Sequence, residues 1–492
     1  MKTAMGVGLV LGTLSGCPQA GPGTFDLVIV NGRVMDPATG LDAVRTIGIR
    51  GGQIAVIAET PLAAKDTIDA AGLVVSPGFI DLHSHSVAAD GQKWQVRDGV
   101  TTALELEEGA YPVTHWLEAL EGKSLINFGV SAGHIPARIA VVAGAKTLEE
   151  AFRIRTQGEL TAPPAWSHGA TTPDHLAAIE RTIEQGLEAG GLGIGFEVNE
   201  SPGASREEIL MLFKLAKRKG VPIYAHLRLM GVDPINGSLA GVQEVLSNAA
   251  VTGASTHFVH LGSSSSIYAK TVVLMIEDAQ ARGLDVTGEV YPYTAASTGI
   301  QTGLFDGDWR SRLGIDYPDV EWPATGERLT AATFARYHRE GGYAIIHLIK
   351  DANVDFLVGR RGIMIASDAM PLLNGRGHPR GVGTFARVLG RYVRDKKAVD
   401  LMEAIRKMTL LPASRVAGAA PAMSRKGRIS VGADADLTLF DPATVVDNAT
   451  FADPGQASSG IPFVIVGGTV VVRGGALVPG AMPGRAVRRV PR

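Results

Sequence analysis

Hydrophobic and polar positions follow a β-type pattern near both ends of the chain. Short apolar runs without a helical period occur at 25–32, 46–50, 54–58, 435–440 and 463–472. Turn-forming pairs accompany them, Asn-Gly at 31–32 and Gly-Gly at 51–52 and 467–468. We therefore predict that residues 24–75 and 427–478 together form one small β-sandwich, although they lie far apart in the sequence.

The middle of the chain, residues 76–426, alternates short apolar strands with amphipathic helices. One predicted helix begins at Thr172-Pro173, where a capping residue precedes a proline, and ends at Gly190-Gly191. Such α/β alternation over this length favours a parallel (β/α)8 TIM barrel, whose active site lies at the carboxyl ends of the strands. A doubly wound open sheet is the alternative, but no glycine-rich phosphate loop supports it.

A polar, irregular stretch near 298–345 interrupts this alternation. Long segments without a regular pattern inside a compact domain are usually functional loops or lids. We therefore expect this insertion to cover the mouth of the barrel.

The first residues have the features of an export signal. Lys2 precedes a short apolar run at 4–14, and Leu14-Ser15-Gly16-Cys17 resembles a bacterial lipobox. We predict that residues 1–17 are a lipoprotein-type signal peptide and that a lipid on Cys17 anchors the exported, periplasmic-side protein to a membrane. The alternative is an ordinary apolar leader with a chance cysteine. Cys17 is the only cysteine, which excludes an internal disulfide.

Composition excludes some classes of function. The chain has 492 residues, 45% of them hydrophobic and 20% charged, as in a globular protein. Its formal charge of −2 provides no basic surface for nucleic acid. No apolar run reaches the 18 residues that a membrane span needs. A small molecule is therefore the expected partner, while the oligomeric state is left open.

Histidines and an aspartate follow several of the predicted barrel strands. The run at 77–82 ends in His83 and His85, whose spacing of two directs both side chains to one side of a strand. His226, His260 and Asp368 each follow another apolar run. Neutral imidazoles and carboxylates are ligands for divalent metals, and barrel strands converge at their carboxyl ends. The set predicts a metal site in the barrel mouth.

These motifs resemble those of the amidohydrolase superfamily, and within it those of the N-acyl-D-amino-acid deacylases, or D-aminoacylases. The resemblance covers nearly the whole chain after the leader and implies a barrel, a β-sandwich and a zinc centre. The matching strings include Gly99-Val100-Thr101-Thr102, Gly133-His134, Ala225-His226-Leu227-Arg228, Tyr291-Pro292-Tyr293, His378-Pro379-Arg380, Gly383-Thr384-Phe385 and Gly432-Ala433-Asp434-Ala435-Asp436.

The resemblance also implies the ligands of one or two divalent ions, with Zn²⁺ expected and Mn²⁺ as an alternative. His83, His85 and Asp368 would bind at one position, and His226 and His260 at the other. The family has a cysteine ligand on its second strand, where this chain has two consecutive glutamates. We expect Glu108 to replace that cysteine, with Glu107 as the alternative, because a carboxylate binds zinc and bridges two metals.

The same resemblance assigns roles in amide hydrolysis. Asp368 would be the general base and then the general acid, and His134 could stabilise the oxyanion, although a structural role for His134 is equally consistent. Arg380 and Tyr291 match contacts to the substrate carboxylate. Two positions depart from the family. This chain has Gly262 where the family has a lysine that contacts the substrate carboxylate, and Ser86 where the family usually has an aspartate. Arg376 is a candidate to compensate for the lost lysine, although a solvated loop arginine is the default interpretation.

Two other functions are compatible with parts of this pattern. Cyclic-amide hydrolases of the dihydroorotase and hydantoinase kind share the barrel, but they generally use a carbamylated lysine. None of the lysines between 128 and 226 ends an apolar strand; they are Lys146, Lys214, Lys217 and Lys219. A surface lipoprotein that only binds a ligand would not need Asp368 as a proton shuttle. A metal-dependent hydrolase of linear amides is therefore the favoured function.

Overall fold

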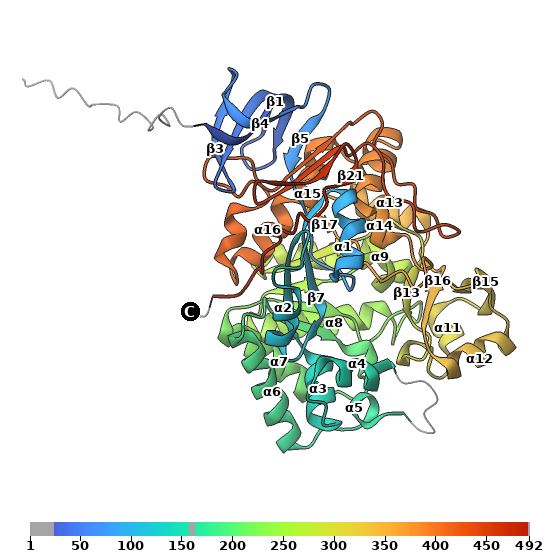
Figure 1. The fold of residues 1–492 in the computed structure, drawn as a ribbon. Coiled ribbons are helices and arrows are strands. Elements are labelled where there is room, and N and C mark those ends of the chain that lie inside the picture. Colours follow the sequence, from blue (N-terminus) through green and yellow to red (C-terminus); the bar gives the residue numbers. More distant parts are fainter. Residues whose placement is uncertain (1–23, 157–162, 491–492) are drawn as a thin grey trace, which may run out of the picture.

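A parallel barrel forms the centre of the molecule in the computed structural model, which describes residues 24–156 and 163–490 (Figure 1). Its eight strands pair in the order β17-β12-β11-β10-β9-β8-β7-β6. They are β6 (Phe79–Asp81), β7 (Val100–Ala110), β8 (Asn127–Gly133), β9 (Ile194–Glu197), β10 (Ile223–His226), β11 (Thr256–Phe258), β12 (Val286–Val290) and β17 (Ile363–Ile365). The (β/α)8 barrel prediction is confirmed.

Contacts just beyond β6 and β17 close the barrel. A parallel bridge joins Ser84 to Ala369, and the backbone N–H of His85 donates to the Ala369 carbonyl over 2.8 Å. The N–H of Ser367 also donates to the Asp81 carboxylate over 2.9 Å. Closure therefore brings the residues that follow the first and last strands side by side.

Helices surround the barrel and connect its strands (Figure 1). They are α1 (Ala89–Gln95), α2 (Val113–Leu120), α3 (His134–Val142), α4 (Leu148–Thr156), α5 (Ala165–His168), α6 (Pro173–Glu188), α7 (Arg206–Lys219), α8 (Ser238–Thr252), α9 (Leu261–Ser264), α10 (Ala269–Ala281), α13 (Asp351–Gly359), α14 (Arg380–Arg387), α15 (Leu401–Met408) and α16 (Leu410–Ala417). The Thr172 side chain caps α6 as predicted, accepting a hydrogen bond from the backbone N–H of His175. Among the described residues, no helix is both long and apolar enough to cross a membrane.

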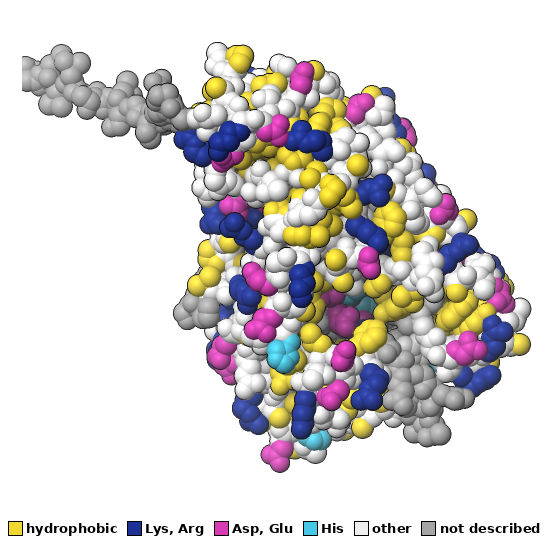
Figure 2. Space-filling view, viewed as in Figure 1, with side chains coloured by type: hydrophobic (Ala, Val, Ile, Leu, Met, Phe, Trp, Pro, Cys, Tyr) yellow, Lys and Arg dark blue, Asp and Glu magenta, His cyan; other side chains and the backbone are white. Residues whose placement is uncertain are grey.

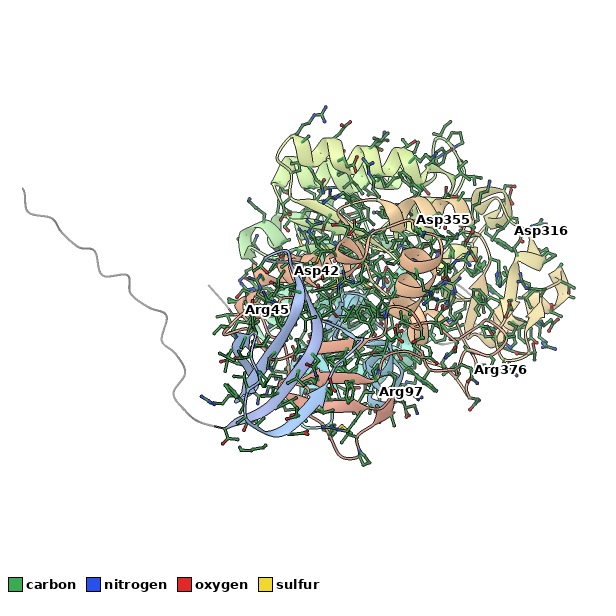
Figure 3. The ribbon with its side chains drawn as sticks, turned by 90° about the horizontal axis from the view of Figure 1, so that it is seen from above. Asp42, Arg45, Arg97, Asp316, Asp355 and Arg376 are labelled. Atoms are coloured by element: carbon green, nitrogen blue, oxygen red, sulfur yellow. The ribbon has the colours of Figure 1, made fainter. Side chains whose placement is uncertain are left out.

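Both ends of the chain join in one nine-stranded sheet, which Figures 1 and 3 show beside the barrel. Strand β5 pairs antiparallel with β18, and this pairing connects the two halves. The strands are β1 (Phe25–Asp36), β2 (Leu41–Arg50), β3 (Gln53–Ala58), β4 (Ala64–Asp69), β5 (Val74–Pro77), β18 (Leu437–Phe440), β19 (Phe463–Val466), β20 (Thr469–Arg473) and β21 (Ala476–Leu477). Its own apolar core contains residues from both ends, including Ile29 and Leu437.

The Asn-Gly pair at 31–32 does not form the predicted hairpin turn. Strand β1 continues through it, with an irregular register between Ile29 and Gly32. Asn31 has a φ of 60°, which asparagine tolerates better than most residues. The irregularity lies where the parallel partner of β1 changes from β4 to β5. A local turn signal was therefore overridden by strand pairing on both sides of β1.

A third, four-stranded sheet lies in the segment predicted as an insertion. Its order is β13-β16-β14-β15, from β13 (Ala296–Gly299), β14 (Val320–Trp322), β15 (Glu327–Arg328) and β16 (Tyr343–Ile346). Helices α11 (Trp309–Leu313) and α12 (Ala331–Glu340) join it through aromatic packing, with the Trp309 and Phe334 ring centroids 5.1 Å apart. Figure 3 shows this sheet and Asp316 on the side of the molecule opposite Asp42 and Arg45 of β2. Its movement as a lid stays a prediction.

Candidate metal centre

A pocket opens at the carboxyl ends of the barrel strands. Figure 2 shows a hollow with acidic and histidine side chains inside it and hydrophobic side chains at its rim. The pocket is lined by His85, His226, His260 and Asp368 from the barrel and by β13 and β16 residues such as Thr298 and Tyr343. Sequence-distant residues with metal-binding chemistry therefore meet at the predicted end of the barrel.

His83, His85 and Asp368 form the first group of donor atoms. The Nε2 atoms of the two histidines are 3.1 Å apart, and each is 3.5 Å from Oδ1 of Asp368. The histidines follow β6 and Asp368 follows β17, so barrel closure brings the group together. Asp368 has a φ of 52°, a strained conformation typical of functional sites. These atoms lie close enough to bind one metal ion.

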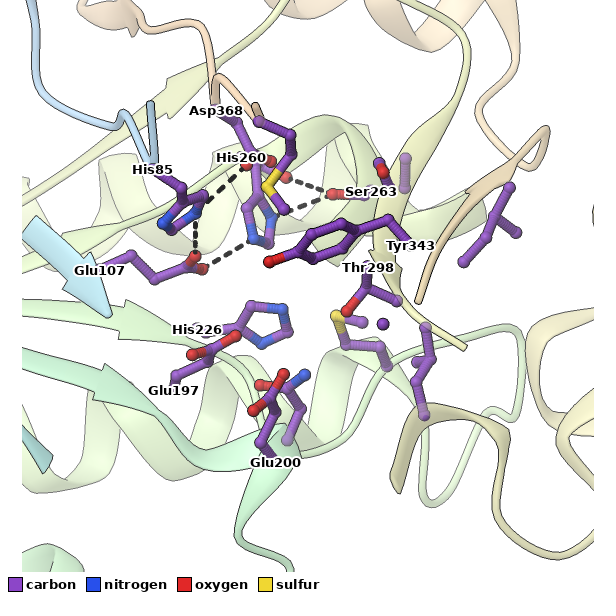
Figure 4. Close-up of a pocket in the computed structure, with 18 of the residues that line it drawn as sticks. His85, Glu107, Glu197, Glu200, His226, His260, Ser263, Thr298, Tyr343 and Asp368 are labelled. Atoms are coloured by element: carbon purple, nitrogen blue, oxygen red, sulfur yellow. Dashed lines mark hydrogen bonds and ion pairs between the residues drawn. The ribbon is translucent and has the colours of Figure 1, made fainter. Parts of the chain in front are cut away.

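Glu107, His226 and His260 form the second group. Oε1 of Glu107 is 2.9 Å from Nε2 of His260, and Oε2 is 2.9 Å from Nε2 of His83. Figure 4 shows the Glu107 carboxylate between His85 and His260, with His226 nearby. One carboxylate therefore contacts both groups, as a ligand bridging two ions would.

The structure places Glu107 between the two groups and Glu108 in a third candidate group with His85 and Glu105. Side chains two apart on a strand share a face, and Glu105 and Glu107 of β7 both point to the histidines. Glu108 instead forms an ion pair with Arg155, and its Oε2 is 3.6 Å from Nδ1 of His85. Glu107 is the glutamate that contacts both groups, and the choice between Glu107 and Glu108 as the ligand stays a prediction.

All four candidate histidine ligands are oriented by a hydrogen bond at Nδ1. Nδ1 of His83 is 2.6 Å from Glu289, and Nδ1 of His85 is 2.8 Å from Glu105. Nδ1 of His226 is 3.0 Å from the Leu227 carbonyl oxygen, and Nδ1 of His260 is 2.8 Å from the Ser264 hydroxyl oxygen. Such partners hold an imidazole in one tautomer and orientation, which leaves Nε2 free for a metal.

Electrostatics in the pocket suit a cation at its centre. Burial opposes charge on Glu107, but His83 and His260 lower its pKa well below the usual value. Burial also lowers the pKa of His226 to about 4, so this imidazole is neutral at pH 7. Burial opposes charge on His83 and His85 as well, but the neighbouring carboxylates raise the pKa of both well above the usual value. These carboxylates therefore attract the positive charge that a metal ion would supply.

Arg380 and Tyr291, the predicted contacts to the substrate carboxylate, lie beside Asp368. Nη2 of Arg380 donates to Oδ1 of Asp368 over 2.7 Å, and the guanidinium carbon lies 4.7 Å from the centre of the Tyr291 ring. Arg380 is only 1% exposed, and its Nε and Nη1 have no hydrogen-bond partner among the described residues. A buried cation with free donors that lines the pocket is suited to binding an anion.

His134 does not join the pocket. It begins α3 with its side chain fully buried, and its Nε2 lies 2.6 Å from Oε1 of Glu208. Glu208 also forms an ion pair with Arg138. His134 is not among the residues that line the pocket, which removes the geometric basis for the predicted oxyanion role. The structural alternative fits its contacts.

Other predicted positions are also located by the structure. Nη1 of Arg376 donates to the Ala452 carbonyl over 2.8 Å, and this residue lines a neighbouring cavity instead of the metal pocket. Gly262 packs close to Val290. Within the described chain, the metal pocket is lined by no lysine. Cys17 lies outside the described residues.

Several polar residues of the site were not predicted from the sequence. Glu105 orients His85, and Glu289 orients His83. Arg155 reaches the pocket from α4 and forms ion pairs there with Glu197 and Glu200. A signal existed for Glu289, which is an acidic residue between Gly288 and Val290 just before the Tyr291-Pro292-Tyr293 motif. No comparable signal existed for Arg155, because its helix is polar and distant in sequence from every ligand.

The donor set fits divalent metal. Histidine nitrogen and carboxylate oxygen are the ligands of catalytic zinc centres, and manganese also accepts them. Two groups that share Glu107 could hold one or two ions, with His83, His85 and Asp368 at one position and Glu107, His226 and His260 at the other.

Known proteins show the same architecture. The model of the amidohydrolase family matches residues 74–471. The chain is 32% identical to N-acyl-D-glutamate deacylase of Alcaligenes xylosoxydans xylosoxydans, over 94% of this chain and 97% of that protein. It is 29% identical to D-aminoacylase of the same organism, over 91% and 94%. The solved N-acyl-D-glutamate deacylase of Bordetella bronchiseptica, complexed with zinc and a phosphonate inhibitor, superposes with a TM-score of 0.78 at 25% identity, over 95% of this chain and 100% of that one.

The family model covers most of the chain, and the relatives are matched over nearly their whole length. The predicted superfamily and its metal-dependent hydrolytic chemistry are confirmed at this level. This chain belongs to the amidohydrolase family.

Proposed function

We propose that the protein hydrolyses the amide bond of an N-acyl-D-amino acid or a close linear analogue. One observation carries the proposal: the oriented histidines, Glu107 and Asp368 surround one centre, and Arg380 lies next to it with unused donors. The centre supplies the hydrolytic chemistry, and Arg380 supplies a place for a carboxylate. The relatives named above act on N-acyl-D-amino acids, which supports the same class here.

A divalent ion, zinc in our proposal, would polarise the scissile carbonyl and lower the pKa of a water molecule at this centre. Asp368 would accept a proton from the attacking water and return it to the departing nitrogen. Burial disfavours charge on Asp368, but Arg380 and His83 lower its pKa well below the usual value. Asp368 is therefore ionised at neutral pH, which a general base must be before it accepts a proton.

Arg380 positions the substrate by its carboxylate. The guanidinium already contacts Asp368, so a substrate carboxylate on Nε and Nη1 would lie beside the proton-transfer group. Sharing Arg380 with a second anion also weakens its hold on Asp368, which raises the basicity of Asp368 when substrate is present. Binding of the carboxylate and proton transfer are thereby linked.

A substrate screen with controlled metal tests this function. N-acyl derivatives of D- and L-amino acids are offered to enzyme stripped with a mild chelator and reloaded with zinc or manganese. We expect turnover of D-derivatives that chelation abolishes and one of the metals restores. Turnover of cyclic amides with no release of amine from any linear N-acyl amino acid would contradict the proposal.

We also propose that the protein is exported and anchored through a lipid on Cys17, on the basis of the Leu-Ser-Gly-Cys string alone. Cys17→Ala should move the protein from the membrane fraction to the soluble fraction and abolish labelling by a radioactive fatty acid. Unlabelled wild-type protein in the soluble fraction would contradict the anchor.

A further inference from the structure

We propose that the substrate of this pocket carries a cationic group, an ammonium or guanidinium, on the part that lies across the metal centre from Arg380. This inference rests on the proposed function and narrows its substrate class. It depends on a group of four charged side chains in the pocket wall: Glu108, Glu197, Glu200 and Arg155.

Arg155 is already saturated by its neighbours. Its Nε donates to Glu200 and its Nη2 to Glu197, each over 2.7 Å, and its Nη1 pairs with Glu108. Each guanidinium nitrogen thus has a carboxylate partner. Arg155 consequently has little capacity left to bind an acidic side chain, although it is a cation in the wall of the pocket.

The carboxylates outnumber this single cation. Three glutamates surround one arginine, and Glu197 and Glu200 are nearly buried, with side chains 9% and 4% exposed. Burial and the neighbouring carboxylates raise the pKa of Glu197 well above its usual value, although Arg155 opposes this. The carboxylates of this wall therefore repel one another, and a cation among them would stabilise them. Each carboxylate also has two oxygens, so acceptor sites remain beyond those that Arg155 uses.

Asn199 provides a second and independent indication of a ligand here. It lies between Glu197 and Glu200 in sequence, in the short 3-10 helix η2 (Val198–Glu200), and lines the same pocket. Its side chain is buried, the residue being 9% exposed, and its Oδ1 has no hydrogen-bond partner among the described residues. Buried amide oxygens are nearly always paired, and a ligand N–H donor would satisfy this one.

The location of the wall identifies the part of the substrate that it meets. In the closed barrel β9, which ends in Glu197, is four strands from β17 in either direction, so the two strands lie opposite each other. Figure 4 shows Asp368 and Glu200 at opposite sides of the centre, with His226 between them. A substrate held by its carboxylate at Arg380, with its amide at the centre, extends its acyl half toward Glu197 and Glu200.

An ammonium could reach this wall from two sources, a free amino group on the acyl half or a basic amino-acid side chain. The opposite placement favours the acyl half, as in an aminoacyl amino acid. On the same argument, an acyl half that carries a carboxylate is disfavoured, because it would meet Glu197 and Glu200.

Two pairs of nearly isosteric substrates test the proposal on the metal-loaded enzyme. Glycyl-D-leucine and N-propionyl-D-leucine differ by an ammonium in place of a methyl on the acyl half. N-Acetyl-D-lysine and N-acetyl-D-2-aminoheptanoate make the same exchange on the side chain. We expect kcat/KM to favour the cationic member of the acyl pair by about tenfold or more, the usual effect of a charge-assisted hydrogen bond.

Glu200→Gln should lower that ratio by about fivefold or more, because it removes one of the charges that the ammonium meets. Glu184→Gln is the matched control. Glu184 lies on α6 and pairs with Lys219 on the surface, so the same change of charge there should leave the ratio unaltered.

Binding to the Asp368→Asn variant, measured by calorimetry, separates the two hypotheses. A cationic preference in binding without turnover by the parent enzyme would reject the deacylase function and keep the cation site. Equal or weaker binding and turnover of the cationic members in both pairs would overturn the cation site, and turnover of the neutral members would keep the deacylase function.

Discussion

The metal centre and the buried group around Glu208 both combine histidine with glutamate, and they differ in where their polar atoms point. In the metal centre, Glu107 lies among Nε2 atoms that converge on one point at the pocket floor. In the other group, His134 and Arg138 both bind Glu208, and Nε of Arg138 donates to the Trp166 carbonyl over 2.7 Å. The hydrogen bonds of the second group join its own members and the segment around Trp166, and Nδ1 of His134 has no partner among the described residues.

Charge balance explains the difference. Glu208 is matched by Arg138, and burial lowers the pKa of His134 so that this imidazole remains neutral. The group therefore fixes α3 to α7 and to the segment around Trp166. The metal centre instead directs free nitrogens toward a common space. Burial of histidine with glutamate does not define a site, whereas convergence of unused donor atoms does.

Asp368→Asn should have the largest effect. An amide cannot accept the proton, so we expect kcat to fall by about a thousandfold, within the range of general acid–base catalysis. His83 and His85 still chelate, and metal content should therefore be largely retained. Steady-state kinetics and metal analysis on the same preparation check both statements. Near-full activity would remove Asp368 from the mechanism.

Glu208→Gln should break the buried group around Glu208 without touching the metal. Loss of a buried ionic partner leaves Arg138 uncompensated and should lower the free energy of unfolding by about 3 kcal/mol or more. Denaturant titration measures the loss, and unchanged metal stoichiometry is the internal control.

The same variant has a pH signature. Burial opposes charge on Glu208, but His134 and Arg138 lower its pKa from 4.5 to about 2. A lowered native pKa contributes stability above pH 4.5 that is lost as the pH falls toward 2. We expect this loss in the parent and not in the variant. Parallel stability curves for the two proteins across that interval would contradict the assignment.

Glu107→Gln and Glu108→Gln distinguish the two adjacent glutamates. A neutral amide at position 107 should weaken metal affinity by about 10- to 100-fold, because the bridging charge is lost. Glu108 pairs with Arg155, so its variant should retain metal as the parent does. Metal retention after mild chelation decides between them. Metal loss only in the Glu108 variant would identify Glu108 as the ligand.

His134→Gln should have the smallest effect. We expect kcat to stay within about twofold of the parent and stability to fall by about 1 kcal/mol, the usual cost of one hydrogen bond. Kinetics and thermal unfolding of the purified, metal-loaded variant test this. A rate loss of about a hundredfold would return His134 to the reaction as an oxyanion donor.

The local sequence pattern predicted structure correctly where a feature depended on a single strand or helix. The run before His83 and His85 predicted a strand that delivers two imidazoles to one side, and the Thr172-Pro173 start of α6 was correct. The Asn-Gly pair at 31–32 was misleading, because two neighbouring strands hold β1 extended through it. Long-range pairing outweighed the local preference there.

The amino-acid sequence by itself determined the barrel, the joining of both chain ends in one sheet, and the residue types of the metal centre. Those features follow from periodicity and from the rule that parallel strands converge at their carboxyl ends. Only the tertiary structure placed Glu107 between both groups of donor atoms and enclosed His134 with Glu208. It alone brought Arg155 to the pocket, where its contacts depend on residues of β7, β9 and η2. The direction of a side chain and the balance of charge around it depend on every element packed nearby, and that information is not local in the sequence.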